Sequence, residues 1–124
     1  MEQMVERMNA HRRSVHCPDL VWMQGAAGAA QAHADDMARR GYFAHQSPEG
    51  AGPADRLRAQ GVGYRAMAEN IAHHPGAARE VLQGWLASPG HRSNLERCTY
   101  THHGLGVREG RWVHLFVTPV SAAP

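Results

Sequence analysis

Three segments of the chain set a titratable side chain beside an apolar anchor, and they span residues 42–45, 68–72 and 85–95. They supply His45, Glu69 and His91, which lie 24 (45 to 69) and 22 (69 to 91) positions apart, so these residues meet only if the fold brings them together. Two imidazoles and one carboxylate can hold a zinc ion and leave a position open for water. This set is the candidate for metal binding or acid-base chemistry.

Each of these residues also has a structural interpretation. A single loop histidine is more often a hydrogen-bonded surface residue than a ligand, Glu69 can cap a turn, and Ser88 can end the helix that precedes Pro89. Ser88 could instead be a nucleophile activated by His45 or His91, but no GxSxG pattern surrounds it. The structural role is therefore the simpler explanation for Ser88.

The elements that must position these residues are mainly helical in the first three quarters of the chain. The spacing of apolar residues predicts helices over 2–14, 24–40, 53–60 and 75–88, with an irregular strand over 62–72. Ser88-Pro89-Gly90 is expected to break the last helix. Near the C-terminus, the apolar runs 104–108 and 111–118 flank Glu109-Gly110, which predicts a β-hairpin.

The second run of the hairpin is apolar on both faces, which indicates a strand covered from both sides. We therefore expect an α+β fold: a three-layer α-β-α sandwich with a small central antiparallel sheet. Trp85 and Phe116 should lie in its core. At 124 residues, with 43% apolar and 19% charged residues, the chain is expected to form one domain over 1–124 and to be a monomer.

Charge and hydropathy exclude several classes of function. All 13 basic residues are arginines against 11 acidic residues, a formal charge of +2, and no basic run with interleaved aromatics occurs, so we do not expect nucleic-acid binding. No apolar run reaches the roughly 18 residues of a membrane span, and the N-terminus lacks the apolar core of a signal peptide. The chain is then either cytoplasmic or a secreted protein whose leader has been removed.

The remaining histidines and the two cysteines leave alternatives open. Cys17 and Cys98 match no metal-clip spacing, so they form either two buried thiols or one long-range disulfide. The pairs His73-His74 and His102-His103 are expected to be solvated, with a second, weaker metal site as the alternative. His114, on the two-faced strand, is expected to be buried and hydrogen-bonded, although it could reach the cleft.

Six motifs follow one another along the chain: Phe43-x-His45, Pro48-x-Gly50, Asp55-Arg56, Glu69-Asn70-Ile71, the block Trp85-x-x-Ser88-Pro89-Gly90-His91-Arg92-x-Asn94-Leu95, and Gly104-x-Gly106. In number, order and spacing they resemble bacterial members of the CAP superfamily (cysteine-rich secretory proteins, antigen 5 and pathogenesis-related proteins). The resemblance covers residues 8–116. It implies an α-β-α sandwich with a cleft that holds two histidines and two glutamates.

By position, His45 and His91 match the two histidines of the cleft and Glu69 matches one glutamate, with Asn70 beside it. Ser88 stands where eukaryotic relatives have the second glutamate, which puts a mechanism with two carboxylates in doubt. The resemblance also implies a Cys17–Cys98 disulfide and therefore an extracellular protein.

The function implied is a secreted binding module. Its cleft would hold a divalent metal such as zinc, through His45, His91 and more weakly Glu69, and would take a small, lipidic or cell-surface ligand. One alternative is a metal-dependent hydrolase or peptidase in which Glu69, His45 and His91 are catalytic. Another is that Glu69 only hydrogen-bonds the two rings and the cleft holds water.

Overall fold

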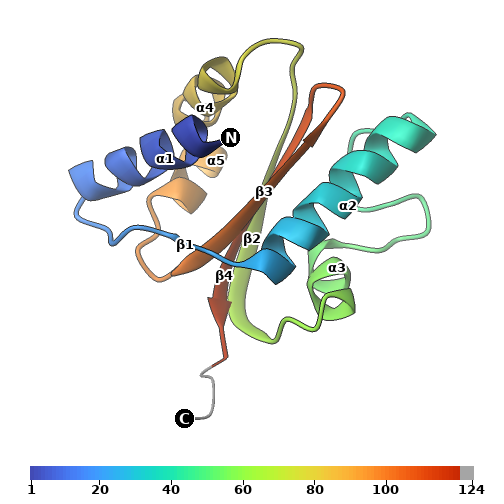
Figure 1. Ribbon diagram of the computed structural model, residues 1–124, viewed down its shortest axis with the longest axis horizontal. Coiled ribbons are helices and arrows are strands. Elements are labelled where there is room, and N and C mark those ends of the chain that lie inside the picture. Colours follow the sequence, from blue (N-terminus) through green and yellow to red (C-terminus); the bar gives the residue numbers. More distant parts are fainter. Residues whose placement is uncertain (121–124) are drawn as a thin grey trace.

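Residues 1–120, which the computed structural model describes, form one mixed sheet flanked by helices (Figure 1). The elements in chain order are α1 (Glu2–Ser14), β1 (Val21–Trp22), α2 (Gln24–Arg40), α3 (Pro53–Ala59), β2 (Tyr64–His73), α4 (Ala78–Ala87), α5 (Pro89–Leu95), β3 (His102–Arg108) and β4 (Arg111–Pro119). The strand order across the sheet is β1-β3-β4-β2, so β2 lies at an edge. None of the helices described is long and apolar enough to cross a membrane.

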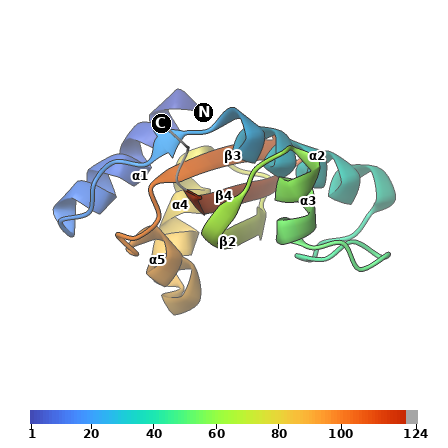
Figure 2. The same cartoon turned by 90° about the horizontal axis from the view of Figure 1, so that it is seen from below.

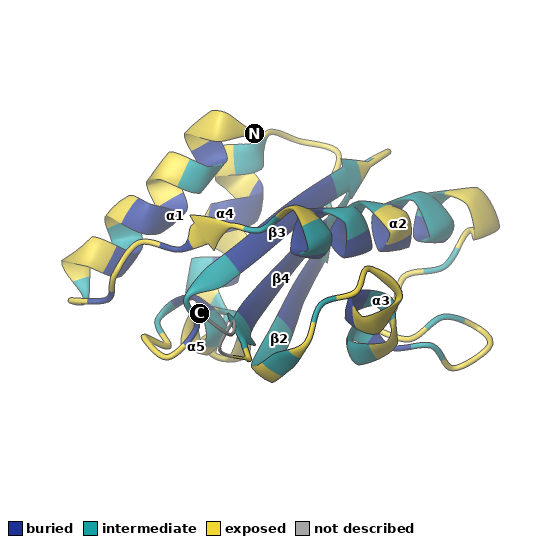
Figure 3. Cartoon of the chain, turned by 60° about the horizontal axis from the view of Figure 1, so that its bottom comes forward, coloured by how far each residue is buried: buried dark blue, intermediate teal, exposed yellow. Residues whose placement is uncertain are grey.

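The sheet separates two helical layers, as predicted. In Figures 1 and 2, α1, α4 and α5 lie on one side of the sheet and α2 and α3 on the other. Each layer closes its own apolar cluster, with Trp85 and Phe116 on the α1 side and Ile71 and Val113 on the α2 side. Trp85 is 2% exposed and Phe116 0%, which confirms both as core residues. Figure 3 shows β3 and β4 buried along most of their length.

The hairpin is confirmed, and two glycines explain how closely α2 packs on it. A Cβ on Gly104 would lie 2.0 Å from the backbone nitrogen of Ala27, and one on Gly106 would lie 2.5 Å from that of Gln31. Only a residue without a side chain allows this approach, so the Gly104-x-Gly106 motif is a packing device.

Four details differ from the sequence prediction. Pro89 begins a new helix, α5, immediately after ending α4, because proline suits the first position of a helix as well as a break. The two-residue strand β1 pairs in parallel with β3, so the sheet is not purely antiparallel. The helix expected over 75–88 begins only at Ala78. His103, expected to be solvated, is 0% exposed, because its place on β3 turns its ring into the core.

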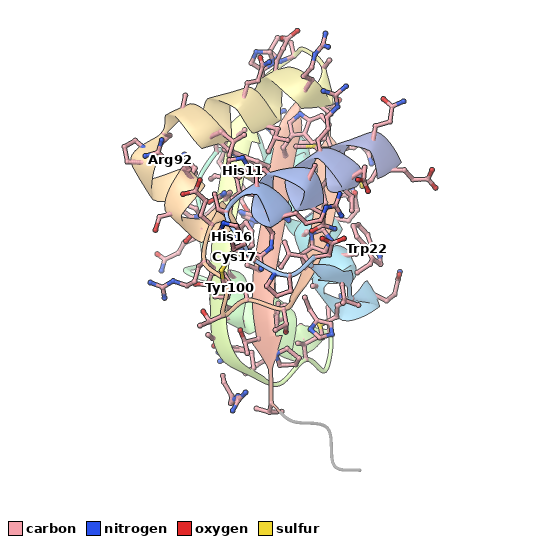
Figure 4. The ribbon with its side chains drawn as sticks, turned by 90° about the vertical axis from the view of Figure 1, so that its left-hand side faces the viewer. His11, His16, Cys17, Trp22, Arg92 and Tyr100 are labelled. Carbon is pink, nitrogen blue, oxygen red and sulfur yellow. A yellow bond between two sulfur atoms is a disulfide. The ribbon has the colours of Figure 1, made fainter. Side chains whose placement is uncertain are left out.

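The turn after α1 is joined to the segment after α5 by the disulfide Cys17–Cys98, in the region where Figure 4 labels Cys17 and Tyr100. The two Cα atoms are 4.8 Å apart although the residues are separated by 81 positions. This confirms the pairing that the family resemblance implied. On the chain-entropy estimate, a loop of this length stabilises the fold by at most about 4 to 5 kcal/mol.

Arg12 of α1 is 0% exposed and is bound by backbone carbonyls. Its Nε donates to Pro18 at 2.9 Å, its Nη1 to Leu95 and Arg97 at 3.0 and 3.1 Å, and its Nη2 to Tyr100 at 2.9 Å. One guanidinium therefore ties α1 to the end of α5 and to the chain that leads into β3.

We expect Arg12→Ala to lower the free energy of unfolding by at least about 3 kcal/mol, because it leaves several buried carbonyls without donors at about 1 to 3 kcal/mol each. Urea denaturation measures this. The matched control is Arg13→Ala, whose exposed ion pairs with Glu6 and Asp19 should contribute less than about 1 kcal/mol each. Equal losses in the two variants would show that the carbonyl contacts of Arg12 are not important to the fold.

Candidate functional site

The candidate site is built around the edge strand β2, where two consecutive side chains point to opposite faces of the sheet. Glu69 meets the loop 41–52 that follows α2, and Asn70 meets α5. The alternation of a β-strand thus lets one short motif position residues from two different helical layers. Both residues are buried.

On the first face, the Glu69 carboxylate holds His45 and Arg56. His45 Nδ1 lies 2.8 Å from Glu69 Oε1, and Arg56 Nη2 donates to Glu69 Oε2 at 3.2 Å. Arg56 also donates to the backbone oxygens of His45 at 2.7 Å and Ala51 at 3.0 Å, which fixes the loop. The side chains of Glu69 and Arg56 are 2% and 12% exposed, whereas that of His45 is 52% exposed.

The contact with Glu69 raises the pKa of His45, against the smaller opposing effects of burial and of the Arg56 charge. Because a carboxylate only accepts hydrogen bonds, His45 Nδ1 carries the proton, and Nε2 is the ring nitrogen open to a ligand. The site therefore presents one exposed imidazole on a buried ionic support.

On the second face, α5 supplies His91. Its Nδ1 lies 2.9 Å from Ser88 Oγ, and its backbone oxygen accepts a hydrogen bond from Asn70 Nδ2 at 3.1 Å. Asn94 donates to Asn70 Oδ1 at 2.8 Å, so the amide of Asn70 is held at both ends. Burial, and secondarily the charge of His45, lowers the pKa of His91. The pKa values of the two histidines of the site, His45 and His91, are thus shifted in opposite directions.

The residues that the sequence singled out form two sets of contacts, one on each face of β2. His45 contacts Glu69, while His91 contacts Ser88 and Asn70. Glu69 is paired with His45 and Arg56, so it does not bridge the two rings as one alternative supposed.

Sequence reasoning noted Arg56 only as part of a motif. Its role depends on how the loop 41–52 closes over β2, and neither composition nor spacing reveals that closure.

The residues fit a metal ion only in part. No group of three or more His, Cys, Asp or Glu within residues 1–120 is placed to hold a metal ion. The metal donors that remain are the Nε2 atoms of His45 and His91. The Nδ1 atom of His45 is hydrogen-bonded to Glu69, and the Nδ1 atom of His91 is hydrogen-bonded to Ser88. A carboxylate behind a ligating histidine is a usual supporting arrangement for zinc, so Glu69 would support His45 instead of binding the metal itself.

The remaining histidine pairs do not combine into a second site. His73 pairs with Arg111 at one end of the sheet, and His102 pairs with Val117 near the other end. The two pairs therefore cannot hold one metal ion jointly in this fold, and a weaker metal site at either pair stays a prediction.

A cavity of about 730 Å³ lies beside the site, between the C-terminal half of α2, the loop 47–51 and the tip of the β3–β4 hairpin. Arg56 lines it, so this residue belongs both to the cavity wall and to the support of Glu69. Much of the remaining lining is charged and internally paired, as in Arg40 with Asp36 and Glu49. Such a lining suits a polar ligand better than a lipid tail.

Comparison with known proteins agrees with this architecture. The family model for the Cysteine-rich secretory protein family (CAP) matches residues 5–117. Two proteins of Bacillus subtilis (strain 168) are each 33% identical over 94% of the chain: the uncharacterized protein YkwD and the uncharacterized membrane protein YlbC. The chain spans 46% and 34% of their respective lengths.

Solved structures show the same fold. An extracellular protein containing a SCP domain from Bacillus anthracis str. Ames superposes with a TM-score of 0.91 at 36% identity, covering 95% of this chain and 40% of that one. An outer surface protein from Borrelia burgdorferi gives a TM-score of 0.86 at 18% identity, covering 97% of this chain and 92% of that one. The second likeness supports the fold alone.

We expect Glu69→Gln to lower the pKa of His45, because the variant removes the main contact that raises it and leaves burial and the Arg56 charge, which lower it. Titration of the histidine rings by NMR measures the shift. Glu80→Gln, at an exposed position near His74, is the control and should leave His45 unchanged. A His45 midpoint that does not move in Glu69→Gln would contradict this account of the site.

Proposed function

Because this chain belongs to the cysteine-rich secretory protein (CAP) family, we propose that it is an extracellular binding module whose ligand contacts His45. The observation that carries the proposal is the contrast in exposure around Glu69. A buried carboxylate and a largely buried arginine hold an imidazole that is itself 52% exposed. A ring oriented in advance loses little freedom when it binds, which favours affinity.

The chemistry around His45 supports a polar ligand. Its ring nitrogen can donate or accept, Arg56 adds a positive charge, and the adjoining cavity is lined mainly by charged residues. The lipidic ligand that the family resemblance also allowed has less support from these residues. An extracellular location rests on the disulfide, which forms in oxidising compartments, and on the extracellular relative of 36% identity.

A divalent metal, with zinc as the leading candidate, is part of the proposal through the Nε2 atoms of His45 and His91. Two imidazoles leave positions on the metal for water or for ligand atoms, and the bound metal would act as a Lewis acid. Glu69 orients His45, while Ser88 and Asn70 position His91.

A hydrolase is the second candidate, and the observation that favours it is the contact of 2.9 Å between Ser88 Oγ and His91 Nδ1. The lowered pKa of His91 would keep this ring neutral and able to accept a proton. Against it, no carboxylate within residues 1–120 accepts a hydrogen bond from His91 to orient its ring, and Ser88 occupies the position immediately before the first residue of α5. We therefore rank binding above catalysis.

We expect the metal-free protein to bind Zn²⁺ at pH 7.5 and to bind it more weakly at pH 5.5 in isothermal titration. Imidazoles ligate only when neutral, and the raised pKa of His45 should make the loss begin at a higher pH than for an ordinary histidine. The variant His45→Ala/His91→Ala should lose binding, whereas His73→Ala/His74→Ala should keep it. Unchanged binding in the first variant would place the metal outside this site.

We expect no hydrolysis of p-nitrophenyl acetate above the buffer rate, with or without EDTA, because no carboxylate hydrogen-bonds His91 among the described residues. Turnover that disappears in Ser88→Ala but persists in His73→Ala would favour a serine hydrolase instead. Turnover that EDTA abolishes would favour the metal-dependent one.

A further inference from the structure

Two histidines that the cleft does not use are bonded to each other in the centre of the domain. His103 Nδ1 on β3 lies 2.9 Å from His114 Nε2 on β4, and both residues are 0% exposed. The outer nitrogens, His103 Nε2 and His114 Nδ1, are buried without a partner among the described residues. With both rings neutral, one donates and the other accepts, so the shared bond is satisfied.

The surroundings of the pair are apolar or positively charged. Trp85 of α4 stacks on His114 with ring centres 5.9 Å apart, and Trp22 of β1 meets His103 edge-on at 5.5 Å. On β4 the ring of Phe116 lies 4.1 Å from that of His114, and on β2 the neutral Asn70 is its cross-strand partner.

The titratable groups whose charge acts on the pair are Arg12 of α1 and His102 of β3. Neither can neutralise an added proton. A proton on either ring would place an uncompensated charge in an apolar core, and with both rings protonated the two facing nitrogens would also meet donor to donor.

We propose that the His103–His114 pair is an acid-sensitive lock, which holds the α1 and α4 layer on the sheet at neutral pH and releases it when the surroundings become mildly acidic. This inference stands independently of the proposed ligand site. It would make the domain lose its packed core in a pH range where most surface contacts still hold.

The histidine pair makes the domain less stable as the pH falls, because its pKa values differ between the folded and unfolded states. Burial is the main cause that lowers the pKa of His103 to about 4 and that also holds the pKa of His114 well below its usual range, whereas an unfolded histidine titrates near 6.5. The unfolded state therefore binds more protons below pH 6.5, so the stability is fully present above that value and is lost as the pH falls. Each imidazole raises the unfolding constant by up to about tenfold per pH unit, and the pair by up to about a hundredfold.

Opening of the core around the His103–His114 pair would also disturb the cleft residues. Trp85, stacked on His114, donates from Nε1 to the backbone oxygen of Ile71 on β2, next to Asn70. The same helix leads directly to Ser88 and α5, which carries His91. The Cys17–Cys98 bridge keeps the chain after α1 attached to the chain after α5, so the opened state should close again at neutral pH.

The test is urea unfolding of the intact, oxidised chain between pH 7.5 and 4.5, followed by near-ultraviolet circular dichroism. Glutamine can donate and accept a hydrogen bond but does not titrate, so His114→Gln should reduce the rise of the unfolding constant by up to about tenfold per pH unit. The exposed His73→Gln is the matched control and should follow the parent protein. His33, also buried with a lowered pKa, is present in all three proteins and cancels.

A second measurement covers the case in which His114→Gln does not fold. NMR titration of the parent protein should show that the rings of His103 and His114 titrate well below pH 6.5 for as long as the fold persists. Two results would overturn the proposal: all histidine rings titrating near pH 6.5 in the folded domain, or the same pH dependence of unfolding in His114→Gln and the parent protein.

Discussion

The constraint on which this fold depends is the burial of a positive charge at Arg12 among backbone carbonyls. A guanidinium in a core must satisfy its donors locally, because an unpaired buried charge costs several kcal/mol. Arg12 does so with the carbonyls of Leu95 and Arg97 at the end of α5, where the helix dipole is negative, and with those of Pro18 and Tyr100. These contacts fix α1 and α5 to each other, and the disulfide closes the same region covalently.

The geometry of the cleft follows from the same arrangement. Arg12 holds the C-terminal end of α5 through Leu95, while Asn70 of β2 holds the backbone of His91 nearer its start. The helix that carries His91 is thus fastened at both ends. On the other face, Arg56 fastens the loop of His45 to Glu69. In each case a side chain that donates to backbone oxygen positions the residue that meets solvent.

The sequence was sufficient for elements that are long enough to show a clear pattern of apolar residues. The 3.6-residue pattern of α1 and α2 and the two-faced run of β4 predicted their places and the layered fold. The sequence prediction failed where one residue can serve two elements and where an element is very short. Pro89 ends α4 and also starts α5, and the two-residue strand β1 is too short to show any period.

The residues of the site and of the core pair were predicted only where a sequence motif marked them. His45, Glu69 and His91 could be assigned through the family motifs. The burial of His103 and the role of Arg56 depend on strand register and loop closure, and neither leaves a local pattern.

Burial and a carboxylate partner act in opposite directions on the pKa values of the histidines in this domain. His45 has Glu69 beside it, so its pKa is raised and its charged form is stabilised. His103 and His114 have Arg12 near them, and their pKa values are lowered, mainly by burial. As the pH falls towards 6, the first effect favours the folded state and the second opposes it.

The second effect should dominate, because the His45 ring is half exposed and its ion pair is screened by water, whereas the two core rings are fully buried. The acid limit of the domain is therefore set in the core between α1 and the sheet, and not at the surface where the ligand would bind.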